Sequence, residues 1–96
     1  MAQTKKVVFI AKDDSIEELK QLLTDMVKPS QEEEGCLLYH IYQMKEKPTT
    51  FVVIETWESE EALDGHRNSK HYKYYKSHFE PYTAEKYSDE LIELGV

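Results

Sequence analysis

Residues Phe51 to His71 read FVVIETWESEEALDGHRNSKH, and this stretch decides the predicted fold. It begins with four apolar residues, Phe51 to Ile54, that are aromatic or β-branched. A continuous apolar run of this kind is typical of a strand that is buried on both faces. The only tryptophan, Trp57, marks the end of the run. We therefore expect a strand over residues 49–57 that brings Trp57 to one end of a sheet.

Two short helices are predicted after this strand. Ser59 is a suitable N-cap for a helix over residues 60–66, and acidic residues follow it in the first turn, where the helix dipole favours them. Ser69 is suited to cap a second helix over residues 70–79, which Pro81 ends.

The break between these helices places two histidines near the end of the strand. Binding sites often form where loops and helix ends meet the end of a rigid sheet. We therefore expect a site between the sheet and the two short helices, bordered by Trp57, His66 and His71.

A longer helix is predicted over residues 15–28. Ser15 and Glu18 have the spacing of a capping box, in which each side chain bonds the other residue's backbone N–H. Pro29 is expected to kink or end the helix because it cannot donate to the preceding turn. The residues after it can still be helical, with Gly35 as the stop. Apolar residues form one helical stripe, namely Ile16, Leu19, Leu22, Leu23, Met26 and Val27.

Residues 36–44 predict a strand that is apolar on both faces. One face carries Leu37, Tyr39 and Ile41, and the other carries Leu38, His40 and Tyr42. A short turn at residues 45–48 joins this strand to the one over residues 49–57, which implies an antiparallel hairpin.

The order of elements predicts an α+β, ferredoxin-like fold. Residues 5–12 form a first strand and residues 84–94 a fourth, so the order is strand, helix, strand, strand, helical segment, strand. This is the split βαβ arrangement, a four-stranded antiparallel sheet with its helices on one face. The other face would be bare and apolar, so we expect a homodimer packed sheet to sheet.

Length and charge limit the possible partners. A chain of 96 residues suits one domain spanning residues 1–96. The net charge of -7 argues against a nucleic-acid partner, which requires a basic surface. Most acidic residues lie in helix-like segments, including Glu32 to Glu34, and are interpreted as a solvated face.

The N-terminal sequence and the cysteine content indicate a cytoplasmic protein. Cys36 is the only cysteine, so no internal disulfide is possible, which fits a reducing compartment. The apolar run at residues 7–11 is too short for a signal peptide or a membrane span, so no membrane partner is expected.

The motifs predict no metal, flavin or nucleotide cofactor. No two histidines have the i, i+4 spacing, and neither HExxH nor CxxC occurs. His71 and His78 would lie roughly 10 Å apart along a helix, too far to share a metal. No glycine-rich loop is present to hold a phosphate. Cys36 is interpreted as a small buried filler rather than a nucleophile.

Several side chains between Trp57 and Lys73 are candidates for binding or catalysis. The chemistry of His66 suits a general base near neutral pH, although a surface or capping role is more common for a histidine taken alone. Trp57 is suited to be either a core anchor or a pocket wall, and tyrosine hydroxyls can orient a polar ligand. Arg67, Lys70 and Lys73 would either attract an anionic substrate or form a solvated face.

Three segments resemble the antibiotic biosynthesis monooxygenase family. They are EGCLLY at residues 34–39, FVVIETWESEEAL at residues 51–63, and His66 together with SKHY at residues 69–72. The most specific part is Trp-Glu-Ser-x-Glu-Ala-Leu, with a histidine nine residues after the tryptophan. The similarity extends over nearly the whole chain.

The resemblance implies a dimeric α/β barrel and, for some members, quinol monooxygenase activity with molecular oxygen and without metal, flavin or haem. In such a reaction, a base converts a phenol- or quinol-like substrate into an electron-rich anion that reacts with oxygen. His66 would be the base, and His71 would be a donor that stabilises the anion. Aromatic side chains would form the substrate pocket, namely Trp57, Tyr39, Tyr72 and Tyr75.

The chain also departs from parts of the family. Glu34 stands where proline often precedes the glycine. The haem-degrading branch is not expected, because His66 and Tyr75 stand where that branch has a second tryptophan and a haem-ligating histidine. A branch that acts on a phosphorylated signalling sugar has a similar pattern, here His66 followed by HYK at residues 71–73. An isomerase or binding protein for such a sugar, or a non-catalytic dimeric small-molecule-binding domain, is therefore an alternative to the monooxygenase.

Overall fold

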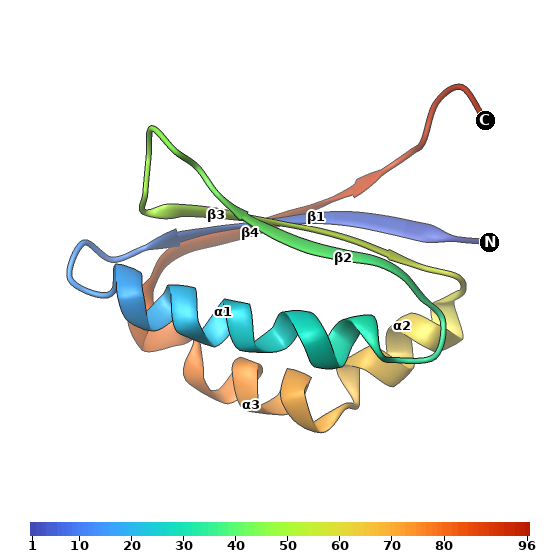
Figure 1. Cartoon of the computed structure of the whole chain (residues 1–96), viewed down its shortest axis with the longest axis horizontal. Coiled ribbons are helices and arrows are strands. Elements are labelled where there is room, and N and C mark those ends of the chain that lie inside the picture. The colour runs from blue at the N-terminus through green and yellow to red at the C-terminus, as the bar shows by residue number, and fades with distance from the viewer.

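The computed structural model describes residues 1–96 and has the predicted ferredoxin-like architecture (Figure 1). Four strands form one sheet in the order β2-β3-β1-β4, and every neighbouring pair is antiparallel. The helices all lie against one face of the sheet (Figure 1). The elements are β1 Gln3–Ala11, α1 Ile16–Gln31, β2 Cys36–Gln43, β3 Thr50–Trp57, α2 Glu60–Arg67, α3 Lys70–His78, the 3-10 helix η1 Glu80–Tyr82, and β4 Thr83–Leu91. None of the helices combines the length and the apolar character that a membrane crossing requires.

The central strand β3 alternates in burial. Its side chains toward the helices are buried, whereas those on the other face, apart from Thr50, are only partly covered. The prediction of burial on both faces is therefore only half correct, because in a single chain the helices cover one face. The buried set is Phe51, Val53, Glu55 and Trp57.

The apolar stripe of α1 packs onto the sheet as predicted, whereas its two ends differ in part from the prediction. The Ser15 hydroxyl donates to Asp14 Oδ1 at 3.1 Å and makes no cap bond, so the capping box does not form. The helix also continues through Pro29 to Gln31. Pro29 lies in the last turn, where its missing N–H costs one bond, and the Glu32 N–H beyond it still donates to the Lys28 carbonyl at 3.2 Å.

Strand β2 turns Tyr39 and Ile41 toward the helices, as predicted, but Leu37 does not follow them. Its side chain is 60% exposed. The register against β3 shifts between Cys36 and Leu38, and this irregularity breaks the alternation at the start of the strand. Strand β4 ends at Leu91 because its partner Thr4 is close to the start of β1, so the predicted extension to residue 94 has no strand to pair with.

The sheet face opposite the helices carries an apolar row across all four strands. The register aligns Tyr42 with Val52, Val52 with Val8, and Val8 with Tyr87. The two tyrosines at the ends of this row are 57% and 52% exposed.

Candidate active site

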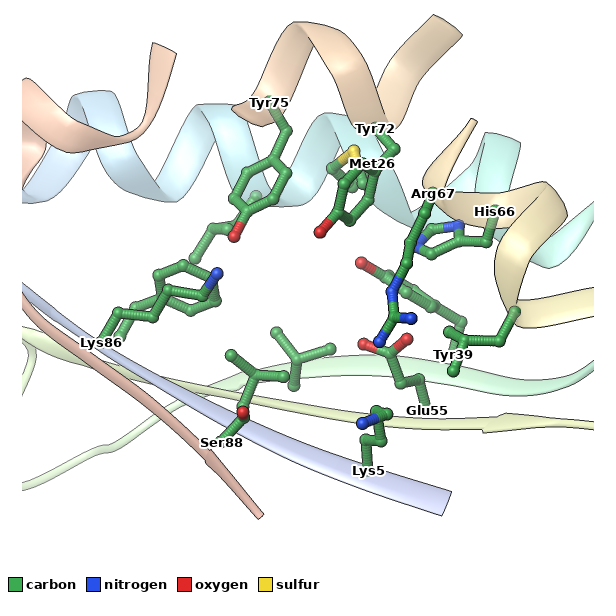
Figure 2. Close-up of a pocket in the computed structure, with 15 residues that line it drawn as sticks. Lys5, Met26, Tyr39, Glu55, His66, Arg67, Tyr72, Tyr75, Lys86 and Ser88 are labelled. Atoms are coloured by element: carbon green, nitrogen blue, oxygen red, sulfur yellow. The ribbon is translucent and has the colours of Figure 1, made fainter. Parts of the chain in front are cut away.

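A cavity of about 140 Å³ lies between the sheet and the three helices (Figure 2). Its floor comes from the helix-facing side chains of the strands, and its roof comes from α1, α2 and α3. Apolar and aromatic groups form most of the wall. The polar groups among its lining are Lys5, Tyr39, Glu55, His66, Arg67, Tyr72, Tyr75, Lys86 and Ser88.

The sheet register brings the floor residues together. Tyr39 pairs with Glu55, and Glu55 pairs with Lys5, so these three form one row across β2, β3 and β1. Phe9 pairs with Lys86 in another row. Residues from four separate strands therefore meet at one place because each lies at a helix-facing position.

Three phenol hydroxyls point into the cavity, from Tyr39 on the sheet and from Tyr72 and Tyr75 on α3 (Figure 2). Tyr39 and Tyr72 also make hydrogen bonds through their backbone atoms. Burial raises the pKa of Tyr39 and of Tyr75. The hydroxyls of Tyr39 and Tyr75 therefore keep their protons at neutral pH and are available as donors to a ligand.

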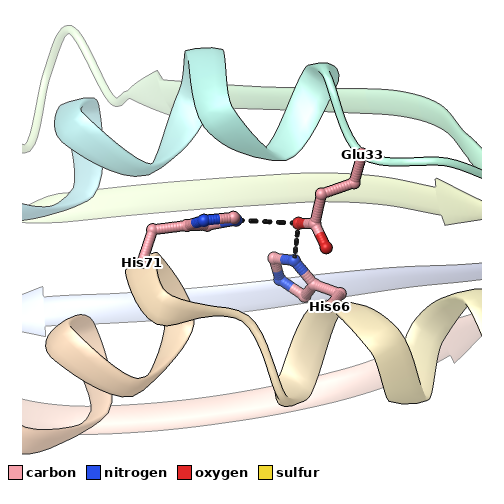
Figure 3. Close-up of side chains that lie close together, drawn as sticks. All are labelled: Glu33, His66 and His71. Carbon is pink, nitrogen blue, oxygen red and sulfur yellow. Dashed lines mark hydrogen bonds and ion pairs between the residues drawn. The ribbon is translucent and has the colours of Figure 1, made fainter.

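His66 lies at the inner end of the cavity and is only 2% exposed. It sits in α2, which starts where the Ser59 hydroxyl accepts from the Ala62 N–H at 3.1 Å, the predicted cap. Its ring packs against Trp57 in a tilted arrangement with a centroid distance of 4.5 Å. Its Nδ1 lies 2.6 Å from Glu33 Oε2 (Figure 3). The other ring nitrogen, Nε2, is directed toward the cavity (Figure 2).

Glu33 accepts a second hydrogen bond, from His71. Oε2 of Glu33 lies 2.8 Å from His71 Nε2, so both imidazoles point at one carboxylate oxygen (Figure 3). The side chain of Glu33 is only 16% exposed. The interpretation of Glu32 to Glu34 as a solvated face was therefore wrong for Glu33. No sequence signal singled it out, since it lies in an acidic run and is 33 residues from His66 in the chain.

The structure separates the predicted site residues into two groups. Tyr39, His66, Tyr72 and Tyr75 line the cavity. Trp57 and His71 do not, contrary to the predicted border of the site. Trp57 is fully buried behind His66. His71 faces away from the cavity and lines a shallow surface groove, because α3 starts with a new cap at Ser69 and turns the ring toward Glu33.

Trp57 instead positions a second carboxylate that the sequence analysis missed. Its indole Nε1 donates to Glu55 Oε1 at 2.8 Å. Glu55 is 7% exposed, and its carboxylate points into the cavity (Figure 2). Strand alternation could have identified Glu55, because residues two apart in a strand lie on the same face of the sheet. Glu55 therefore lies on the same face as Val53 and Trp57, the face toward the helices.

Positively charged side chains are also part of the cavity lining. Arg67 lines the cavity as predicted, but Lys70 lies on the surface groove and Lys73 is exposed on α3. Two lysines from the strands, Lys5 and Lys86, line the cavity instead. The Lys86 ammonium lies 4.9 Å from the Phe79 ring centroid, and partial burial lowers its pKa.

Comparison with known proteins gives a consistent assignment. The family model described as antibiotic biosynthesis monooxygenase matches residues 6–77. A protein of Mycobacterium tuberculosis named "Putative monooxygenase Rv0793" is 35% identical over 69 residues, which are 72% of this chain and 67% of that protein.

Solved structures agree with this match over nearly the full chain. The crystal structure of PA3566 from Pseudomonas aeruginosa has a TM-score of 0.93 at 29% identity, covering 98% of this chain and 95% of that one. The structure of Rv0793 has a TM-score of 0.92 at 27% identity, covering 100% and 98%. This chain belongs to the antibiotic biosynthesis monooxygenase family.

Proposed function

We propose that the protein is a monooxygenase for a small phenol- or quinol-like aromatic, and that molecular oxygen reacts directly with the substrate anion without metal or flavin. The observation that carries this proposal is the position of His66. One of its ring nitrogens is held 2.6 Å from Glu33, and the other is directed toward a cavity lined with aromatic residues.

The size of the cavity supports a single-ring substrate. Its volume of about 140 Å³ is close to that of cavities of about 150 Å³ that bind benzene. Aromatic walls favour a flat ring through edge and face contacts. A phosphorylated sugar, the second candidate, gains support from Lys5, Arg67 and Lys86. However, it is larger and more hydroxylated than one ring, so the volume and the aromatic lining favour the phenol.

Glu33 prepares His66 to act as the base. An ionised carboxylate only accepts hydrogen bonds, so the neutral imidazole must carry its proton on Nδ1 and keep a free lone pair on Nε2. When Nε2 takes a proton from the substrate, the negative charge of Glu33 stabilises the imidazolium. Glu33 is thus a positioning residue, and His66 is the catalytic base.

The tyrosines take the role that the sequence analysis gave to His71. Their protonated hydroxyls are available to donate to the oxygen atoms of the substrate anion inside the cavity. Arg67 and Lys86 add positive charge to the cavity lining. Donors that are already oriented stabilise the anion at little reorganisation cost.

The substrate itself supplies the electrons for the reaction. After His66 removes a phenolic proton, the anion gives one electron to oxygen, and the resulting superoxide and ring radical combine through a carbon–oxygen bond. That ring carbon then loses its hydrogen as the oxygen–oxygen bond breaks, which releases water and leaves a carbonyl. A quinol plus oxygen therefore becomes a hydroxyquinone plus water.

Oxygen consumption by metal-stripped protein with a panel of hydroquinones tests this function. We expect uptake above the buffer control that persists in chelator and falls about 10²- to 10⁴-fold in His66→Ala. His78→Ala, which removes an exposed histidine of α3 outside the cavity, is the matched control and is expected to retain the rate.

Three results would reject the proposal: uptake no faster than in buffer, uptake that is lost with chelator and restored by metal, or full activity in His66→Ala. Hydroquinone binding without oxygen uptake would instead favour the non-catalytic binding domain.

A further inference from the structure

The side chains of Glu33, His66 and His71 form a set of potential metal ligands. Glu33 Oε2, His66 Nδ1 and His71 Nε2 all lie within 4.8 Å of one another. Figure 3 shows both imidazole rings pointing at the same carboxylate oxygen. Two imidazoles and one carboxylate are also the protein ligands of known zinc sites, in which a fourth position stays open.

The positions of these three residues allow an ion to enter. Glu33 lies in the connection between α1 and β2, and its side chain is 16% exposed, as against 22% for His71. A metal bonds such ligands at about 2.0–2.2 Å. A small rotation of the Glu33 side chain away from the rings would therefore make room for an ion at the point where the two ring nitrogens converge.

A second feature points to a cation at the same place. Next to Glu33 is a surface depression of about 420 Å³ whose lining includes Glu34, Glu58 and Glu61 and no lysine or arginine. Carboxylates around a concave surface raise the local concentration of cations. Imidazole ligands favour zinc, copper and nickel over magnesium and calcium, which prefer oxygen ligands.

We propose that Glu33, His66 and His71 bind one divalent transition metal ion of the zinc class, and that the ion prevents His66 from acting as a base. The second part rests on the proposed function, but the first does not. A neutral imidazole has one N–H, so when a metal occupies Nδ1, the proton moves to Nε2. The nitrogen that faces the cavity then changes from an acceptor to a donor.

Calorimetric titration of the metal-stripped, tag-free protein with Zn²⁺ tests the site itself. We expect one ion per chain, with affinity reduced by at least about 10-fold in His71→Ala and in Glu33→Gln. His78→Ala and Glu17→Gln, which change exposed residues outside the three ligands and the acidic depression, are matched controls and are expected to bind Zn²⁺ within about 2-fold of the original chain. Thermal melts monitored by circular dichroism establish that each variant is folded.

Nitrogen-15 spectra of the histidine side chains test the switch. Zn²⁺ is expected to shift the Nδ1 signal of His66 and to place its proton on Nε2. Zn²⁺ binding that is unaffected by both His71→Ala and Glu33→Gln in folded protein would overturn the site. Unchanged His66 signals at saturation would overturn the switch. Neither measurement depends on oxygen uptake. The metal site can therefore be disproved while the proposed oxygenase activity remains, and the oxygenase activity can be disproved while the metal site remains.

Discussion

The chemistry of His66 is set by its neighbours from β3, from the connection after α1, and from β2 and α3. Trp57 at the end of β3 packs against its ring, Glu33 after α1 bonds Nδ1, and the tyrosines of the cavity face Nε2. The sequence predicted His66 as a base candidate because of the residue type and its place after the strand. It did not predict Glu33, because a contact across 33 residues leaves no local pattern.

Replacing Glu33 tests whether this carboxylate positions the base. Glu33→Gln is expected to lower kcat for hydroquinone oxidation by about 10- to 100-fold with little change in KM, because an amide does not stabilise the imidazolium. Glu34→Gln, which changes the adjacent acidic residue outside the cavity, is expected to match the original chain. Equal rates for the two variants, measured by oxygen consumption, would show that Glu33 has no such role.

At the scale of the elements, Gly35 controls how closely α2 approaches the connection that carries Glu33. Its φ is +83°, and a Cβ at this position would lie 2.5 Å from the Ala62 Cβ. Its carbonyl also accepts from the Glu58 N–H at 2.8 Å. The sequence predicted Gly35 as a stop for the helix, but the close approach of α2 depends on tertiary packing that no local signal contains.

Two glycine substitutions distinguish the effect of this close packing on stability from the effect of helix propensity. Gly35→Ala is expected to lower the free energy of unfolding by about 2–4 kcal/mol, because it adds a strained φ and a clash. Gly65→Ala, within α2 and with nothing within 4 Å of the added Cβ, is expected to raise it by about 0.5–1 kcal/mol. Urea denaturation measures both values, and a Gly35→Ala protein as stable as the original would contradict the packing described.

At the scale of the whole molecule, the two faces of the sheet have different roles. One face is covered by helices and contains the cavity, whereas the other exposes the row from Tyr42 to Tyr87. The element order and the antiparallel sheet were predictable because the strand and helix periodicities differ clearly. The position of the cavity between the sheet and the short helices was also predicted, but its full lining was not, because Lys5, Glu55 and Lys86 come from strands whose placement against the helices is set by packing.

We propose that a second copy of the chain covers this exposed row, giving a homodimer. Burial of Tyr42, Tyr87 and the partly covered Val52 would drive the association. Light scattering is expected to show a dimer at micromolar concentration, and Tyr42→Lys is expected to weaken it at least about 10-fold. Tyr74→Lys on α3, 58% exposed, is the control for an added charge elsewhere. A monomeric original chain, or a Tyr42→Lys dimer of unchanged affinity, would argue against this interface.

Deprotonation of a phenol by His66 is tested most directly by the absorption spectrum of 4-nitrophenol bound to the protein, because its anion absorbs at longer wavelength than its neutral form. At a pH where the free compound is mostly neutral, adding protein is expected to produce the nitrophenolate band. His66→Ala should abolish the band while His78→Ala retains it, since only His66 lines the cavity. Bound 4-nitrophenol that stays neutral, or a band of equal intensity in His66→Ala, would contradict His66 as the base.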